Sequence, residues 1–497
     1  MLFNSIEFLL FFPAVVLLYY AIPGRLRMYW LLVTSYAFYM CWNPTYALLL
    51  LLSTLVTFGS GLLIGRAMQR REAGKRVLVH EKAWIALSFA INLGILFFFK
   101  YFGFVVDNIN TVRASMGLAA VKPGFDVLLP VGISFYIFQA LSYTMDVYRR
   151  QVRVEKNFFR YATFVSFFPQ LVAGPIERSS HLLTQFDEPH RFSFSAVRDG
   201  LLMMVWGFFQ KIVIADRAAI VVNQVFNYSS YYSGLELLVA MLLFAVQVYG
   251  DFAGYSCIAI GAAQVMGFDL MENFRRPYFA TSVADFWRRW HISLSTWFRD
   301  YLYIPLGGNR KGKVRRYLNI MIVFLCSGLW HGAAWNYVIW GALNGLYQVI
   351  GSLLKPLRQK LMRRCGMRTD TFSHRLLQML TTFVLIDIAW VFFRANTVSD
   401  AFGILRRLFV WNPEVLLNGS LLQLGFDTAQ WVTLGVSLAV MLAVSVMQER
   451  GIRLRETLGR QEAWLRWTVV IAGVLSVLVL GIYGPGFDAA AFIYFQF

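Results

Sequence analysis

The sequence predicts an all-α polytopic membrane protein, and composition carries most of that prediction. Hydrophobic residues make up 58% of the 497 residues and charged residues only 15%, against about 25% charged residues in an average soluble protein. So few polar groups cannot cover a globule of this size, which excludes a soluble enzyme. Continuous apolar runs such as 83–99 exclude a transmembrane β-barrel, whose strands alternate over roughly ten residues. An aromatic share of 17% excludes intrinsic disorder.

Apolar segments follow one another along the whole chain, and each is a candidate helix. A helix needs about 20 residues to cross a hydrocarbon core of ~30 Å. The segments 235–266 and 317–350 exceed one crossing and contain glycines, so we expect both to be interrupted. We expect about 10–12 spanning or re-entrant helices in one membrane-embedded domain over residues 1–497. The remaining segments lie at 5–22, 29–43, 46–65, 83–105, 126–146, 160–174, 200–222, 376–393, 431–447 and 467–484.

The net charge of +19 comes from short basic clusters between the apolar segments. The positive-inside rule places such clusters in the cytoplasm, and the loop 106–125 and both termini then lie on the extracytoplasmic side. The excess charge therefore needs no polyanion, and we expect the lipid bilayer rather than a nucleic acid as partner. The clusters lie at 66–82, 149–156, 310–316, 355–368 and 450–466.

His331 lies deep in an apolar segment, 15 residues after Arg316. At 1.5 Å per residue, an upright helix would carry it about 22 Å into the membrane. Loss of water disfavours the charged imidazolium there, which leaves a neutral ring able to accept a proton. Ionisable groups at this depth are candidates for function, although a core histidine bonded to a neighbouring helix explains the pattern equally well. No second ligand stands four residues away, so we expect no metal site.

His291 lies in a segment, 284–316, that contains too many charges to span a membrane. Apolar side chains recur three or four residues apart from Phe286 to Tyr301, which predicts an amphipathic helix at the cytoplasmic interface. Its polar side has two open roles. It either anchors the helix to lipid headgroups or lines a cavity mouth where cations bind a phosphate-bearing donor. The polar stripe consists of Arg288, His291, Ser295 and Arg299.

Two acidic residues also lie in apolar segments. Asp251 stands beside Gly250, and Asp387 precedes Arg394 by seven residues. An unpaired carboxylate is costly in a membrane, so we favour pairing between helices, through Arg394 or a tyrosine, over catalysis for both.

Motifs along the chain resemble one protein family. WRRWHISLSTWFRDYLYIPLGGNR (287–310) precedes SGLWHGAAW (327–335), and together they resemble the membrane-bound O-acyltransferase family, especially its bacterial alginate O-acetylation branch. The GGNR at 307–310 and the terminal FIYFQF favour this branch over the similar D-alanyl transferase of teichoic acid synthesis. The core motifs fall within 167–395. Further matches are FFPQLVAGPIER (167–178), QVYGDFAGYSCIAIG (247–261), NFRRPYF (273–279), FFRA (392–395) and FIYFQF (492–497).

This resemblance implies a ring of helices around a central catalytic tunnel. It matches His331 to the invariant histidine of the family and His291 to a second histidine of this branch. It further implies acetyl-CoA as the donor substrate, with no bound cofactor, and a location in the bacterial cytoplasmic (inner) membrane. An extracytoplasmic SGNH-type protein is the implied partner, which passes the acyl group to an exopolysaccharide through the export machinery.

We therefore expect an O-acyltransferase that moves an acetyl group from a cytoplasmic thioester to a hydroxyl at the outer face. His331 is the expected general base. His291 is expected to position the donor or stabilise the oxyanion, with Arg288, Ser295 and Arg299 on the donor side. Candidate tunnel residues are Trp290, Trp330, Trp335 and Asp251, although core packing explains the tryptophans equally well.

Two other classes of function remain as alternatives. A transporter also places polar residues inside the membrane, but the inverted repeat common in secondary transporters is not visible in the sequence. A non-catalytic subunit of a polysaccharide assembly would share the membrane character and lack the chemistry. Release of coenzyme A from labelled acetyl-CoA separates an enzyme from both.

Overall fold

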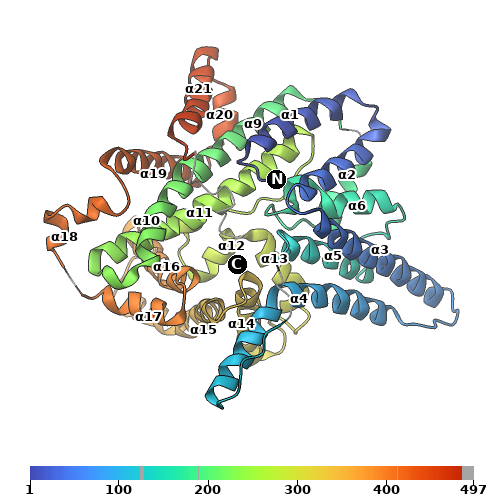
Figure 1. Ribbon diagram of the computed structural model, residues 1–497, viewed down its shortest axis with the longest axis horizontal. Helices are drawn as coiled ribbons and strands as arrows, with labels where there is room; N and C mark the ends of the chain where they lie inside the picture. Colours follow the sequence, from blue (N-terminus) through green and yellow to red (C-terminus); the bar gives the residue numbers. More distant parts are fainter. Residues whose placement is uncertain (124–127, 189, 411, 484–497) are drawn as a thin grey trace. The chain divides into compact units, whose positions relative to one another are not determined.

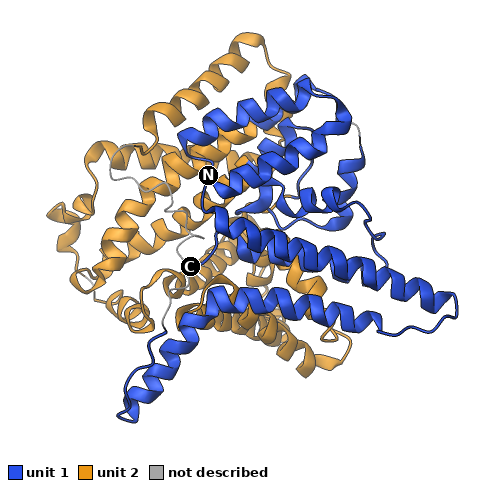
Figure 2. Cartoon of the chain, turned by 45° about the vertical axis from the view of Figure 1, so that its right-hand side comes forward, with its two compact units in different colours: residues 1–201, 259–271 blue, residues 202–258, 272–497 orange. Residues whose placement is uncertain are grey.

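A computed structural model describes residues 1–123, 128–188, 190–410 and 412–483 of the chain. Every regular element in these ranges is a helix (Figure 1). The chain forms two compact units, one of residues 1–201 with 259–271 and one of residues 202–258 with 272–497 (Figure 2). The terminal FIYFQF motif at 492–497 lies outside the described residues.

The first unit follows the apolar segments closely. In it, the long helix α3 packs against α4 and α5. Helix α4 runs ten residues into the loop predicted at 106–125, because no glycine or proline interrupts the chain between Gly103 and Gly117. Gly117 then adopts a left-handed φ of 71°, a conformation that commonly follows a helix end. The helices are α1 (Ile6–Ala21), α2 (Gly24–Met40), α3 (Pro44–Glu72), α4 (Glu81–Ser115), α5 (Ile133–Tyr148), α6 (Phe158–Ser166), α7 (Phe168–Leu171) and α8 (Ser179–Leu182).

The second unit contains both histidines singled out above. Helix α9 (Phe194–Phe208) enters it and continues through a π-helical turn, η2 (Phe209–Ala215), into α10 (Asp216–Asn227). Helix α11 (Gly234–Val265) belongs to this unit up to Ile258. The later helices are α12 (Val283–Arg289), α13 (Ile292–Phe298), the π-turn η5 (Arg299–Tyr303), α14 (Gly312–His331), α15 (Trp335–Arg364), α16 (Phe372–Arg394), α17 (Val398–Arg407), α18 (Glu414–Leu417), α19 (Thr428–Glu449), α20 (Leu454–Gly459) and α21 (Ala463–Leu480).

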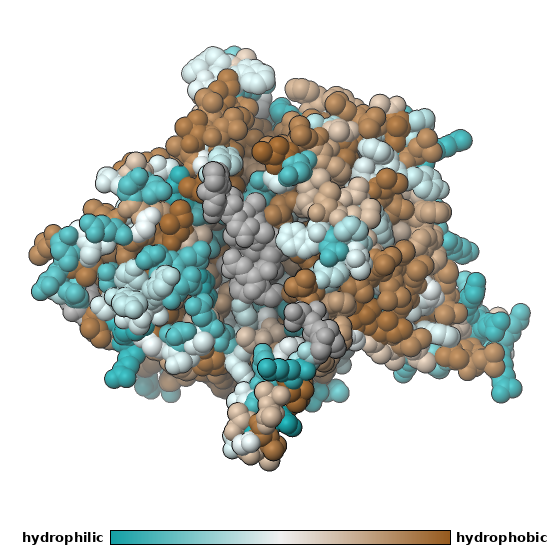
Figure 3. Space-filling model, in the orientation of Figure 1, coloured by the Kyte–Doolittle hydropathy of each residue, from teal (hydrophilic) through white to brown (hydrophobic). Residues whose placement is uncertain are grey.

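Seven of the described helices are long and apolar enough to cross a membrane: α3, α4, α11, α15, α16, α19 and α21. Many large apolar side chains are exposed, among them Leu10 at 72% and Val479 at 74%, and apolar residues cover much of the visible surface (Figure 3). In water such a surface would drive association, whereas lipid solvates it. The chain is a multi-pass membrane protein.

Two of the sequence predictions about helix continuity are wrong. The segment 235–266 is not interrupted, because Gly250 and Gly254 serve close packing within one 32-residue helix. A Cβ on Gly254 would lie 2.7 Å from the carbonyl oxygen of Gly207. The stretch 284–316 is not one amphipathic helix, because its backbone turns left-handed at His291, with φ at 44°. The segment 317–350 is interrupted as predicted, at Gly332.

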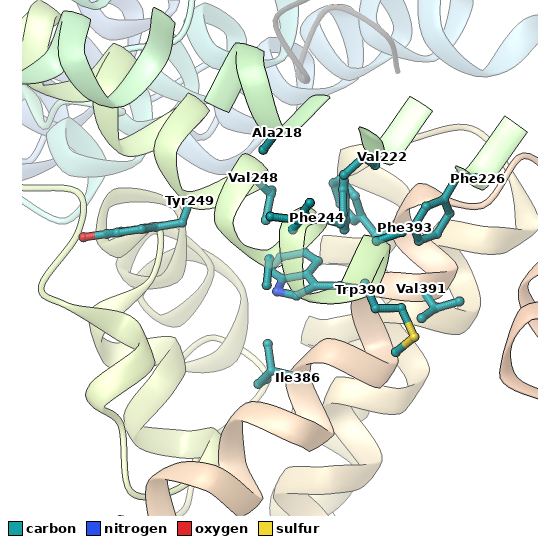
Figure 4. Packing of buried hydrophobic residues seen from close by; sticks show 14 of the residues in the cluster. Ala218, Val222, Phe226, Phe244, Val248, Tyr249, Ile386, Trp390, Val391 and Phe393 are labelled. Atoms are coloured by element: carbon teal, nitrogen blue, oxygen red, sulfur yellow. The ribbon is translucent and has the colours of Figure 1, made fainter. Parts of the chain in front are cut away.

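Buried apolar side chains of α10, α11 and α16 form much of the core of the second unit. Trp390 lies among Phe244, Val248 and Phe393 (Figure 4). The same cluster extends to Trp290 and Trp340, and the ring of Trp340 packs against His331.

Candidate functional site

His331 is the last residue of α14 and is 3% exposed. Its Nδ1 lies 2.6 Å from the carbonyl oxygen of Ser327, one turn earlier in the same helix. A carbonyl oxygen only accepts, so Nδ1 carries the proton of the neutral ring and Nε2 carries the lone pair. The rings of Trp340 and Phe393 lie 4.7 and 5.7 Å from the imidazole. His331 is therefore a base candidate in a buried, aromatic site.

Small residues hold α14 against α15 and thereby fix His331. A Cβ on Gly328 would clash with the carbonyl of Tyr337, and one on Gly341 would clash with the carbonyl of Phe324. The two helices can approach this closely only because glycine lacks a side chain. Gly332 then leaves the helical conformation, with an extended φ of −165°, and ends α14 directly after the histidine.

His291 lies between α12 and α13, outside the seven candidate spans, and is fully buried. Its Nδ1 is 3.2 Å from Oδ1 of Asn273, and the ring of Phe252 packs edge-on at 4.6 Å. Burial, and secondarily the nearby His331, lower the pKa of His291 well below its ordinary value. The ring is consequently neutral at physiological pH.

The structure brings the two histidines together. Their ring centroids are 6.4 Å apart with planes at 82°, and Trp330 contacts both, at 5.8 Å from His291 and 5.0 Å from His331. Two buried imidazoles in one site can take a proton from a hydroxyl and stabilise the charge that follows. Within the described residues, no three His, Cys, Asp or Glu side chains gather as a metal site requires.

The residues expected on the donor side do not join this pair. Because the left-handed backbone at His291 separates α12 from α13, the expected polar stripe on one helix does not form. Arg288 is exposed and its Nε donates to the carbonyl of Ala284, while Arg299 is exposed and pairs with Asp300 at 2.7 Å. The Ser295 hydroxyl donates to the carbonyl oxygen of Trp290 at 3.2 Å.

The candidate tunnel residues differ in their burial and in their neighbours. Trp290 is 1% exposed and packs 5.1 Å from Trp390, and Trp330 contacts both histidines as described. Trp335 is 56% exposed at the start of α15. Asp251 faces Lys211, whose Nζ is 2.7 Å from its carboxylate.

Two features of the site region escaped sequence reasoning. The first is Asn273, which lies in the NFRRPYF motif, and nothing in its residue type marks it as a partner of His291. The second is Lys211, which contacts both Asp251 and Asp216, the latter at 2.6 Å. A lysine inside the apolar segment 200–222 was a visible signal, because a cation at that depth needs an acidic partner. Arg394, offered above as the partner of Asp387, instead donates to Asn223 and Asn227.

Comparison with known proteins gives one consistent result. The model of the membrane-bound O-acyltransferase family matches residues 146–395. A probable alginate O-acetylase of Pseudomonas syringae is 39% identical over 85% of this chain and 78% of its own length. A peptidoglycan O-acetyltransferase of Helicobacter pylori is 33% identical over 78% of this chain and 75% of its own length. A teichoic acid D-alanyltransferase of Bacillus subtilis is 28% identical over 48% of this chain and 62% of its own length.

Proposed function

The chain belongs to the membrane-bound O-acyltransferase family, and from this premise we propose that it transfers acetyl groups to hydroxyls of a cell-surface polysaccharide. The observation that carries the proposal is the pair of buried imidazoles, His331 and His291, 6.4 Å apart in an aromatic site. The relatives named as O-acetylases of alginate and peptidoglycan support acetyl as the acyl group and a polysaccharide as the acceptor class.

In the proposed reaction, His331 is the general base. Its Nε2 lone pair takes the proton of the acceptor hydroxyl as the hydroxyl oxygen attacks the thioester carbonyl. The tetrahedral intermediate collapses, the carbon–sulfur bond breaks, and the leaving thiolate takes the proton from His331. The products are an O-acetyl ester and a free thiol, and His331 returns to its neutral form. The hydrogen bond from Nδ1 to Ser327 keeps Nε2 as the reacting nitrogen throughout.

We propose acetyl-CoA as the donor, bound from the cytoplasm, and an outer-face acceptor in the bacterial inner membrane. The basic cluster at 310–316 lies at the start of α14, whose other end carries His331. This arrangement suits a donor that enters from the cytoplasmic side, with both chain termini on the extracytoplasmic side. The proposed partner is an SGNH-type protein that receives the acetyl group outside the membrane.

Acetyl transfer in isolated membranes tests the proposal. Membranes from cells that lack the endogenous protein would carry wild type, His331→Ala or His80→Ala, and would receive acetyl-labelled CoA. His80 is the matched control because it is exposed in the first unit. We expect base-labile label in surface polymer and release of free CoA with wild type and His80→Ala only.

Three outcomes would contradict the proposal. Equal CoA release by wild type and a well-expressed His331→Ala variant would remove the catalytic role of this histidine. No CoA release by wild type, with polymer or small-molecule uptake intact, would favour a transporter or an assembly subunit. Transfer of D-alanine rather than acetyl would identify the other branch of the family.

A further inference from the structure

The side-chain amide of Asn273 lies in a network that leaves it one orientation. Its Oδ1 accepts from the backbone N–H of Ser293 at 3.3 Å and from the hydroxyl of that residue at 3.0 Å. Its Nδ2 donates to the hydroxyl of Ser256 at 3.2 Å. A flipped amide would face the Ser293 N–H with its own N–H group, donor against donor. The oxygen of Asn273 therefore points toward α13.

The same oxygen is the nearer partner of the His291 ring, whose Nδ1 also lies 3.5 Å from the Ser293 hydroxyl. Nδ1 of His291 is 3.2 Å from Oδ1 of Asn273, and an amide oxygen only accepts. We propose that Asn273 is a positioning residue that fixes the ring of His291 with its proton on Nδ1 and its lone pair on Nε2. This inference rests on the proposed acetyl transfer for its catalytic meaning, whereas the proton's place on the ring is independent of that reaction.

Backbone hydrogen bonds join the segment that carries His291 to the segment that carries Asn273. The carbonyl of Asn273 accepts from the N–H of Ile292 at 2.9 Å, and the N–H of Arg275 donates to the carbonyl of Arg289 at 2.9 Å. These bonds flank His291 and keep it in its left-handed conformation, which a residue other than glycine adopts only under such constraint. Asn273 thus sets both the direction of the ring and its proton.

A fixed tautomer decides what His291 can do. A neutral ring with its lone pair on Nε2 accepts a hydrogen bond there and donates none. It suits the acceptor hydroxyl, or the imidazolium that His331 becomes after taking the proton, because both present a donor hydrogen. It does not suit a developing oxyanion, which needs a donor. His331 then takes the proton while His291 orients or stabilises the group that carries it.

The described side chains packed on His291 include one other titratable ring. The elements packed on it present Phe252 from α11 and Trp330 and His331 from α14, and of these only His331 titrates. In the segment that carries Asn273, Arg275 pairs with Glu272 at 2.7 Å. A carboxylate placed at residue 273 would be a new charge directly on Nδ1–H, and it would favour the imidazolium and raise the pKa of His291.

Nitrogen NMR of the full chain with ¹⁵N-labelled histidine rings tests the tautomer directly. Protonated and unprotonated ring nitrogens have well-separated shifts, and the spectrum of His291→Gln assigns the signals. We expect His291 to show a protonated Nδ1 and an unprotonated Nε2 at neutral pH, without any substrate present. A proton on Nε2 in wild type would overturn the proposal, whatever the outcome of the acetyl-transfer assay.

Two variants test the part played by Asn273. In Asn273→Leu, we expect the His291 signals to become a mixture of tautomers and turnover to fall about tenfold or more. In Asn273→Asp, Nδ1 keeps its proton, and we expect the acid limb of the rate profile to move up by about one pH unit or more. As the pH falls, Asn273→Asp should therefore lose activity at a higher pH than wild type does, because the reaction requires neutral His291.

A matched variant separates positioning from folding. Asn92→Asp changes a buried asparagine of α4, in the first unit, whose oxygen accepts from Ser53. It should leave the His291 signals and the acid limb unchanged. An unchanged His291 spectrum in folded Asn273→Leu, or an acid limb in Asn273→Asp that coincides with wild type, would contradict the proposal.

Discussion

His331 and His291 lie in one site and are held in different ways. His331 ends a regular helix, and its Nδ1 bonds to the backbone of that same helix. His291 lies at a left-handed break between two short helices, and its Nδ1 bonds to a side chain 18 residues earlier in the sequence. Helix packing therefore positions the first histidine, whereas a side-chain network positions the second.

This difference predicts which substitutions displace each histidine. Changes in the packing of α14 against α15 should displace His331 and spare the His291 network. Changes on α11 should act on His291 first, because this helix supplies Phe252 and Ser256 to its surroundings. The following variants separate the two cases.

The largest effect is expected for Lys211→Met, in the π-turn η2, whose side chain pairs with Asp251 of α11. Lys211 contacts the buried carboxylates of Asp216 and Asp251, and removing one partner of a buried ion pair costs about 3–5 kcal/mol. Denaturant unfolding in detergent measures the loss. Adding Asp216→Asn and Asp251→Asn should recover most of it, and a triple variant as unstable as Lys211→Met would contradict this account.

Gly332→Ala should act on His331 alone. Its extended backbone tolerates alanine, but the new Cβ would clash with the ring of Tyr337. Overpacking of this kind costs about 1–3 kcal/mol, and a 1 Å shift of a reacting group lowers kcat by up to about 100-fold. The kcat of Gly332→Ala measures the shift, with Gly351→Ala as control, since a Cβ on Gly351 meets open space. Equal kcat for both variants would contradict the placement of His331.

At the two histidines, alanine and asparagine variants should rank in opposite orders of unfolding temperature. Left-handed backbone costs an ordinary residue about 1–2 kcal/mol, and asparagine tolerates it better than alanine. His291→Asn should therefore unfold at a higher temperature than His291→Ala. At the helical residue His331 the order should reverse, because alanine is the better helix former. The same order at both sites would show that backbone conformation does not distinguish them.

The smallest effect is expected for Arg288→Ala. Its exposed side chain attracts a phosphate-bearing donor only through water, which limits the loss to about 1 kcal/mol. We expect the KM for the donor to rise by no more than about fivefold, with kcat unchanged and the difference lost at high salt. A fall in kcat would instead place this arginine at the reacting atoms.

Regular structure was predictable from the sequence because its causes are local. The apolar segments mark most of the long helices, and Arg316 and His331 share the helix α14 that such a segment indicates. The break at His291 was not predictable, since Trp290 and Ile292 carry no turn signal. Backbone bonds from Asn273 and Arg275, remote in sequence, override the helical pattern there. Sequence periodicity contains no information about such contacts.

Turnover and unfolding temperature of His331→Ala, measured on one purified sample, test the two-histidine site most directly. Acetyl-CoA consumption with a hydroxyl acceptor should fall by a factor of about 1,000 or more, since base catalysis and the positioning of the hydroxyl are lost together. The unfolding temperature should stay within a few degrees of wild type, because alanine suits the end of α14. Retained turnover in this folded variant would contradict the assignment of His331 as the base.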